Sequence, residues 1–254
     1  MTEIRGIKTG FDVYDNELGG FHKGQLILVE GKPCVGKAAF ALSLIDNLCN
    51  QNEGTCLYFS VESNPKRLYR KLLEMHCSLE SLDNISSDKW NEVAEEGRKL
   101  LGVNLIVEGF EVTIEKILSK SIEVASKGLI SAIVVDGVSY VADSTGRRVT
   151  SVYPALKKLK ELAIALNCPI VAYTTLSRFV EKDNEDLCEQ MDLYNPINFK
   201  DSVDEVIFLF NEKCYDDDGK KRGKIQIGTA DYMTGISCTF EMEFTHKYRG
   251  KYAV

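Results

Sequence analysis

Apolar, β-branched runs alternate with segments of helical period along most of this 254-residue chain. Six runs predict buried strands, at residues 25–30, 55–61, 104–109, 131–137, 168–175 and 204–210. Five segments between them predict helices, at about residues 36–51, 65–77, 87–101, 113–127 and 151–166. Strands of near-continuous apolar content that are separated by helices are typical of a parallel sheet. The sequence therefore predicts an α/β fold, with a mostly parallel twisted sheet and helices on both faces.

The last part of the chain follows a different pattern. The runs KIQIGTA (224–230) and SCTFEMEF (237–244) flank a break that contains glycine, which predicts a closing antiparallel hairpin. No repeat, linker or low-complexity tract divides the chain, and 254 residues suffice for one large α/β domain. We expect a single domain over residues 1–254.

Composition excludes several classes of protein. No apolar run approaches the roughly 20 residues that span a bilayer, and the first residues lack a signal-peptide core. The eight cysteines form no C-x-x-C pair, which argues against zinc and is typical of free thiols in a reducing cytosol. We expect a cytoplasmic protein with no membrane contact. With a net charge of −7, the chain would need a local basic patch to bind nucleic acid.

The stretch GKPCVGKAAF (31–40) follows one predicted strand and opens a predicted helix. Its first seven residues match the phosphate-binding loop G-x-x-x-x-G-K: Gly31, Lys32, Pro33, Cys34, Val35, Gly36 and Lys37. The two glycines let backbone N–H groups point at phosphate oxygens, and Lys37 would reach the β- and γ-phosphates. The alternative is a strand-to-helix turn with an incidental lysine. The context favours a site for a nucleotide, ATP.

The next residue departs from the motif, because Ala38 stands where Ser or Thr would ligate Mg²⁺. Magnesium retains several waters, so Ala38 weakens the metal site without excluding nucleotide. Asp136 lies at the carboxyl end of a predicted strand, where α/β folds bind ligands, and is the candidate metal residue. Glu62 follows another strand and is the candidate for orienting or deprotonating the attacking water. For either acid alone, a solvated strand end is the plainer interpretation.

The stretch TGFDVYDNELGGFHKGQLILVEGKPCVGK resembles the opening of RecA-like ATPases of the DnaB and KaiC groups. Five segments then resemble, in order, the motifs of the C-terminal motor domain of DnaB-type replicative DNA helicases: KAAFALSLIDN, YFSVESNPKRLYRKLL, IVVDGVSYV, IVAYTTLSR and DSVDEVIFLF. The resemblance runs from about residue 5 to the end of the chain. It implies a RecA-like P-loop NTPase fold and a six-membered ring around single-stranded DNA, with ATP and Mg²⁺ between subunits. It assigns Lys37 to the phosphates, Asp136 to Mg²⁺ and Glu62 to the nucleophilic water. Arg178, in TTLSR, matches an arginine of the family.

Four positions depart from the family pattern: Ala38, Thr175, Thr229 and Asp231. Thr175 replaces a glutamine that senses the γ-phosphate. Thr229 and Asp231 replace the Lys and Arg that reach into the neighbouring subunit's site. Such a finger cation contributes about 10³ to 10⁵ in turnover, and Asp231 would instead direct a negative charge at the phosphates. No Lys or Arg occurs within residues 225–246, so a shift in alignment does not recover one.

Two arginines are weak candidates for DNA contact. Arg147 and Arg148 follow Asp136 on a stretch that lines the channel in the family, although a solvated loop is an equally good interpretation. Met1 lies only a few residues before the first motif. We therefore expect the chain to lack the N-terminal domain and linker helix that build the ring, which leaves self-association open.

Three functions remain after these observations. The first is a DnaB-like motor of DNA replication that hydrolyses ATP and translocates on single-stranded DNA. The second is a nucleotide-binding but catalytically impaired paralogue that acts as a scaffold or regulator. The third is a KaiC-like RecA-fold signalling ATPase, against which the segment FSVESNPKRLYRKLL argues because it is closer to the DnaB group.

Overall fold

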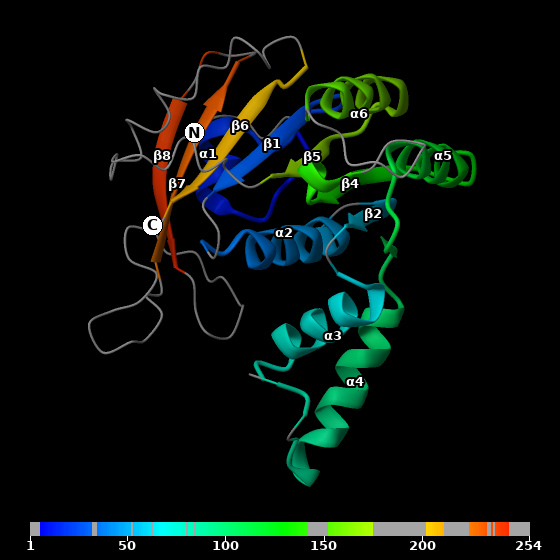
Figure 1. Ribbon diagram of the computed structural model, residues 1–254. Coiled ribbons are helices and arrows are strands. Elements are labelled where there is room, and N and C mark those ends of the chain that lie inside the picture. The colour runs from blue at the N-terminus through cyan, green and yellow to red at the C-terminus, as the bar shows by residue number, and fades with distance from the viewer. Residues whose placement is uncertain are drawn as a thin grey trace.

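One sheet organises the part of the chain that the computed structural model describes, which is residues 6–31, 35–51, 53–61, 63–79, 81–83, 85–141, 152–174, 202–210, 224–232, 235 and 237–243. Its strands are β1 Leu26–Gly31, β2 Thr55–Ser60, β3 Leu105–Gly109, β4 Ile130–Asp136, β5 Ile170–Tyr173, β6 Glu205–Phe210, β7 Lys224–Asp231 and β8 Ser237–Glu243. Their order is β3-β2-β4-β5-β1-β6-β7-β8 (Figure 1). Strands β1 to β6 pair in parallel, and β7 and β8 add an antiparallel hairpin. The predicted fold class is confirmed.

Each of the five predicted helices is present close to its predicted bounds, and one further helix, α1, precedes them in the described part of the chain. They are α1 Asp12–Leu18, α2 Lys37–Gln51, α3 Pro65–His76, α4 Trp90–Leu101, α5 Ile114–Ala125 and α6 Tyr153–Leu166, with short 3₁₀ turns η1 Ser87–Lys89 and η2 Val138–Tyr140. The segment predicted as one helix over 87–101 is divided into η1 and α4. Among the described helices, none has the length and apolar content that a bilayer crossing requires.

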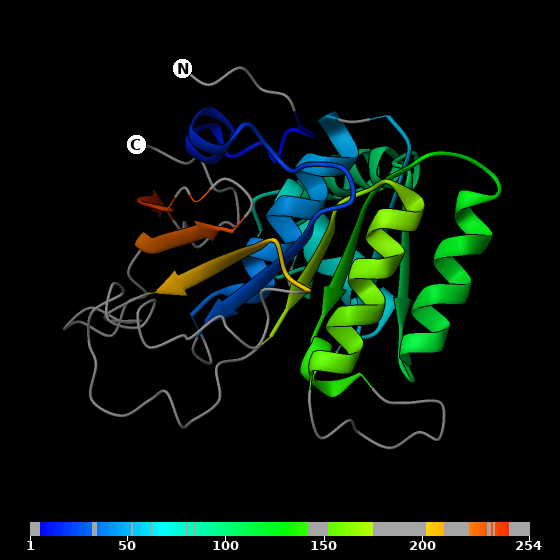
Figure 2. The same ribbon diagram turned by 90° about the horizontal axis from the view of Figure 1, so that it is seen from above.

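Helices cover both faces of the sheet, as Figure 2 shows. On one face, Ile27 and Val29 of β1 join a core that includes α1, α2 and α3. On the other face, Leu26 and Leu28 join a second core with α5 and α6. Successive side chains of a strand point to opposite faces of the sheet, and both faces are buried. The residues on each face are therefore apolar. This arrangement explains the near-continuous apolar runs of the sequence.

Helix α1 was not predicted from the sequence. Buried Asp15 fixes the turn before it, since its carboxylate accepts hydrogen bonds from Thr9 N (2.9 Å), Thr9 Oγ1 (2.8 Å) and Gly10 N (3.1 Å). Gly19 ends the helix with φ 80°, a left-handed conformation that favours glycine. Seven residues provide only about two turns, which is too short for a helical period to stand out.

A buried carboxylate lies between α1 and the hairpin. Glu205, at the start of β6, is 1% exposed, and its Oε2 accepts hydrogen bonds from Tyr14 Oη (2.6 Å) and Gln25 Nε2 (3.0 Å). Its Oε1 has no hydrogen-bond partner among the described residues. Asp231 faces it in register from β7. Burial, with the nearby charge of Asp231, raises the pKa of Glu205 to about 8.

His76 connects three helices and predicts a pH-dependent stability. Its Nε2 lies 2.8 Å from Asp46 Oδ1 on α2, and its Nδ1 lies 3.4 Å from Glu96 Oε2 on α4. The hydrogen bond to Asp46 raises the pKa of His76. The raised pKa means that the stabilisation is fully present below the unfolded value of about 6.5 and is lost as pH rises through the folded value.

We expect His76→Gln to reduce the free energy of unfolding by about 1 kcal/mol below that pH, and by progressively less at alkaline pH. Urea unfolding of both proteins across the pH range checks this difference. His22→Gln is the control, since His22 makes no such ion pair among the described residues. A deficit for His76→Gln that stays constant with pH would contradict the prediction.

Candidate nucleotide-binding site

The phosphate-binding loop joins β1 to α2. Lys32, Pro33 and Cys34 lie outside the described residues, but both glycines are described. Gly36 has φ 113°, a conformation that L side chains avoid. A Cβ on Gly31 would lie 2.8 Å from Val35 Cγ1 and 2.9 Å from the Leu209 carbonyl oxygen of β6. The backbone therefore requires glycine at both positions, as a loop that folds around phosphate does.

Lys37 is the first residue of α2, and its ammonium lies over the loop. Its Nζ donates a hydrogen bond to the Gly31 carbonyl oxygen at 2.6 Å. The first turn of α2 contains no acidic residue, so the partial positive charge of the helix start is not offset there. The loop, the ammonium and the helix start together favour an anion at this position.

Ala38 is exposed at the second position of α2. It presents a methyl group where the motif has a hydroxyl, so this position contributes no metal ligand. Any metal held here would need water in that place.

Asp136 ends β4 at the same edge of the sheet as the loop. Its Oδ2 accepts hydrogen bonds from Tyr58 Oη (3.1 Å) and Ser60 Oγ (3.4 Å) of β2. Val134, two residues earlier, packs in the core on the α2 side, and side chains two apart share a face of a strand. Asp136 therefore points to the face of the sheet that carries α2 and Lys37.

The hydroxyls that hold Asp136 were not identified from the sequence. Ser60 is the register partner of Asp136, and Tyr58 is the residue two before it on the same face. A signal existed, because both side chains carry a hydroxyl group within a mostly apolar strand. Using it required knowledge that β2 lies beside β4, which the order of elements along the chain does not provide.

A second hydroxyl pair lies at this edge, between Ser139 of η2 and Thr174 after β5. The Thr174 backbone N–H also donates to the Val29 carbonyl oxygen (3.0 Å), so the pair joins β4, β5 and β1 beside the loop. Several candidate residues lie outside the described part of the chain: Glu62, Arg147, Arg148, Thr175 and Arg178.

The structure corrects the interpretation of Thr229 and Asp231. Both side chains face into the domain from β7, with exposures of 0% and 5%. Thr229 Oγ1 lies 3.2 Å from Cys238 Sγ, and Asp231 faces Glu205. The prediction that Asp231 directs its charge at a neighbouring subunit is therefore wrong. These residues share the inward face with buried Ile225 and Ile227, an alternation that the alignment to the family motif did not take into account.

Comparison with known proteins gives the family. The family model for the DnaB-like helicase C terminal domain matches residues 6–251. The chain belongs to this family. The DnaB-type resemblance of the sequence motifs is thus confirmed.

The DnaB-like relatives are longer than this chain. The replicative DNA helicase DnaB of Geobacillus stearothermophilus is 26% identical over 255 residues, covering 97% of this chain and 56% of that protein. The replicative DNA helicase DnaB of Rickettsia bellii is 28% identical over 229 residues, covering 84% and 46%. The chain thus spans about half the length of the curated DnaB relatives that it matches.

Solved structures show the same RecA-like DnaB fold. One of them, an isolated ATPase domain, superposes with a TM-score of 0.84 at 20% identity, covering 99% of this chain and 93% of that one. A DnaB-like replicative helicase, whose structure concerns its interactions with primase, gives a TM-score of 0.82 at 20% identity, covering 97% and 61%.

Proposed function

We propose that this chain is a single RecA-like motor domain that binds ATP and hydrolyses it slowly for a DnaB-like protein. The observation that supports the proposal most is the position of Lys37, which lies over a loop whose two glycines the backbone requires. Asp136 ends its strand at the same edge and on the same face. In this proposal, Lys37 binds the β- and γ-phosphates, and Glu62 orients the attacking water.

Magnesium fits the site in part. The Asp136 carboxylate is an oxygen ligand of the kind that Mg²⁺ prefers, and two hydroxyls orient it. Bound Mg²⁺ would neutralise charge on the phosphate oxygens. Ala38 provides no second ligand, so Asp136 would hold the metal through bound waters. Slow hydrolysis follows from this weak placement and from the absence of any Lys or Arg within residues 225–246.

The proposed partners come from the relatives. These are replicative DNA helicases, so we include single-stranded DNA and a ring of subunits in the proposal. A scaffold or regulatory role is the second candidate, because the inward-facing residues of β7 leave this chain with no finger cation of its own there.

Single-turnover ATP hydrolysis with Mg²⁺, with and without single-stranded DNA, tests the proposal alongside equilibrium binding of a fluorescent nucleotide. Tight binding with slow turnover is the expected result. Turnover that DNA accelerates to the level of an active helicase would instead identify a working motor. No nucleotide binding would refute the site.

Position 38 offers a gain-of-function test. We expect Ala38→Thr to lower the Mg²⁺ concentration needed for nucleotide binding by about tenfold, because the hydroxyl adds a direct ligand. Ala38→Val is the matched control, with nearly the same shape and no hydroxyl. Nucleotide binding is measured against Mg²⁺ concentration for the wild-type protein and both variants. Equal Mg²⁺ requirements of Ala38→Thr and Ala38→Val would contradict a metal role for this position.

A further inference from the structure

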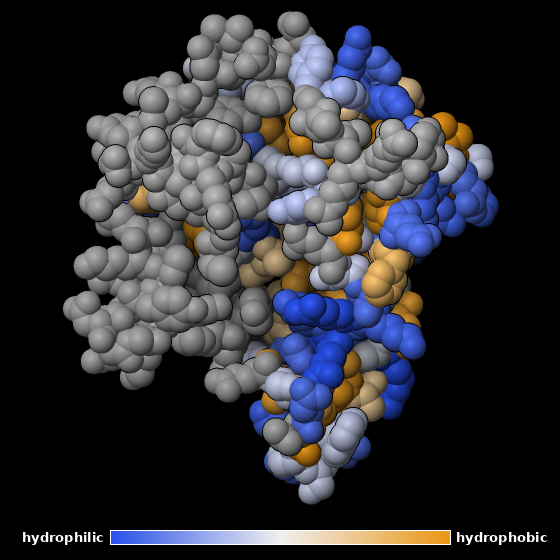
Figure 3. Space-filling view, viewed as in Figure 1, coloured by the Kyte–Doolittle hydropathy of each residue, from blue (hydrophilic) through white to orange (hydrophobic). Residues whose placement is uncertain are grey.

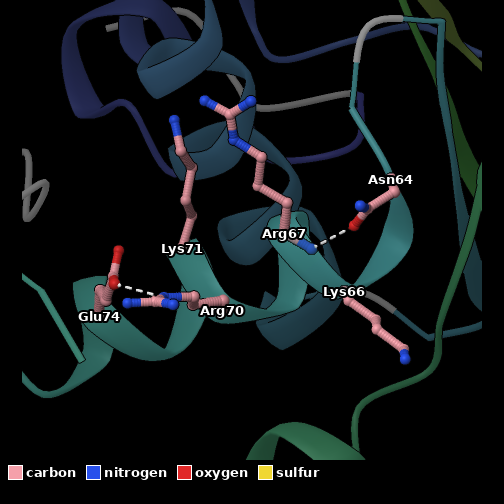
Figure 4. Close-up of a pocket in the computed structure, with 6 residues that line it drawn as sticks. All are labelled: Asn64, Lys66, Arg67, Arg70, Lys71 and Glu74. Carbon is pink, nitrogen blue, oxygen red and sulfur yellow. Dashed lines mark hydrogen bonds and ion pairs between the residues drawn. The ribbon is translucent and has the colours of Figure 1, made fainter. Parts of the chain in front are cut away.

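Helix α3 carries a concentrated positive charge in an acidic protein. Four cations occur within six residues of this helix: Lys66, Arg67, Arg70 and Lys71. They surround an open hollow of about 410 Å³, which is lined by Asn64, Lys66, Arg67, Arg70, Lys71 and Glu74 (Figure 4). Figure 3 shows the hydrophilic surface over this helix.

The sequence of α3 fixes which way these side chains point. Asn64 caps the helix by accepting a hydrogen bond from Arg67 N at 2.7 Å, and Pro65 is the first helical residue. The apolar residues of α3 that face the core are Leu68, Leu72 and Met75. Lys66 and Arg70 lie opposite these residues, and Arg67 and Lys71 flank them, so the cations form two pairs with i, i+4 spacing. The charged face is therefore a stable feature of the fold.

One of the four cations forms ion pairs with described carboxylates. Arg70 Nε lies 3.0 Å from Glu74 Oε1, and Arg70 Nη2 lies 2.6 Å from Asp83 Oδ1. Among the described residues, no carboxylate lies within ion-pairing distance of Lys66, Arg67 or Lys71. The hollow thus retains an excess positive charge, although the whole chain has a net charge of −7.

We propose that this hollow on α3 binds the phosphate backbone of a nucleic-acid strand, through residues other than Arg147 and Arg148. Cations four residues apart on a helix lie about 6 Å apart along its axis, which suits a partner with regularly repeated single negative charges. None of the described residues that line the hollow is aromatic, so they offer no platform for stacking bases. The contact is therefore with the backbone and independent of base sequence.

The place of α3 relates this contact to the nucleotide site. The helix follows β2, whose last residue Ser60 holds Asp136. Its start packs directly on the end of β3, since a Cβ on Gly109 would lie 2.9 Å from Pro65 Cδ. The basic face therefore begins at the sheet edge that carries Asp136. The inference takes DNA as the strand from the proposed function, but it does not require ATP binding.

Salt-dependent binding of a fluorescein-labelled oligothymidylate to the full chain tests the inference. The variant is Arg67→Ala with Lys71→Ala, two exposed or half-exposed positions where alanine favours the helix. The control is Lys23→Ala with Lys157→Ala, which makes the same change in net charge at exposed positions away from α3. The quantity compared is the slope of log affinity against log salt concentration.

For the α3 variant, we expect weaker binding and a slope that is smaller by about 1.4, since each phosphate contact to a single strand contributes about 0.7. The control should retain the wild-type slope. An α3 slope equal to that of wild type, or no binding by wild type, would overturn the inference. A further outcome would overturn it: the wild-type protein binds polyglutamate, and the α3 variant loses this binding but still binds DNA as the wild-type protein does.

The Lys37→Ala variant separates this inference from the proposed function. If the two sites are independent, this variant should lose nucleotide binding. Its slope of log DNA affinity against log salt concentration should equal that of the wild-type protein. If Lys37→Ala also reduced the salt dependence of DNA binding, the assignment of a separate DNA contact to α3 would be overturned.

Discussion

Lys37→Ala should weaken nucleotide binding by about 100-fold, because it removes a charged contact to phosphate from a site that offers no other described cation at the loop. Titration of a fluorescent ATP analogue measures the loss directly. Unfolding provides a second measure, since nucleotide at 100 times its dissociation constant should stabilise the wild-type protein by about 2.7 kcal/mol. The variant should gain almost none of this stabilisation.

Lys23→Ala is the control for charge, because Lys23 is exposed in the turn before β1. It should bind nucleotide as the wild-type protein does. Lys37 also contacts Gly31, so thermal unfolding without nucleotide must show that the variant is folded. A folded Lys37→Ala protein with wild-type affinity would refute the phosphate-loop assignment.

Glu205→Gln should make the protein more stable at neutral pH by about 3 kcal/mol, which follows from a pKa of about 8 in the folded state. Glutamine has nearly the same shape and remains neutral. It keeps an oxygen for the hydrogen bonds from Tyr14 and Gln25, and its amide group replaces the Oε1 that lacks a partner among the described residues.

The direction in which stability changes with pH follows from the coupling between folding and the protonation of Glu205. Because the folded pKa is raised above the unfolded value, the wild-type protein keeps its full stability only below about pH 4.5 and loses it as pH rises through about 8. The groups that face Glu205 are Tyr14 of α1, Gln25 before β1, Asp231 of β7 and the adjacent Asp204. Of these, Asp231 and Asp204 raise the pKa, and the two hydrogen bonds lower it.

Urea unfolding followed by circular dichroism, from acid to alkaline pH, gives the measurement. The advantage of Glu205→Gln should disappear at acid pH and grow toward neutral pH. Glu161→Gln, at an exposed position on α6, should change stability little at any pH. A Glu205→Gln protein less stable than wild type at neutral pH would show that Glu205 is held as a favourable carboxylate.

The local pattern of the sequence was sufficient for the strands, for the five longer helices and for the position of the loop between β1 and α2. Strands buried on both faces leave continuous apolar runs, and the motif joins one of these runs to a helix. Relations across the sheet were not accessible in the same way. Tyr58 holds Asp136 only because β2 lies beside β4, and Asp231 is buried only because the hairpin folds onto α1.

The contact between Gly31 and Leu209 has a mechanical consequence. With no side chain between them, the end of β1 and the backbone of β6 touch directly, and β6 is in turn bonded to β7 and β8. Protein interiors are close-packed and resist compression, so a displacement of the hairpin cannot be absorbed at this point. We therefore expect a load on β7 and β8 to be transmitted to Gly31, the first residue of the candidate phosphate loop.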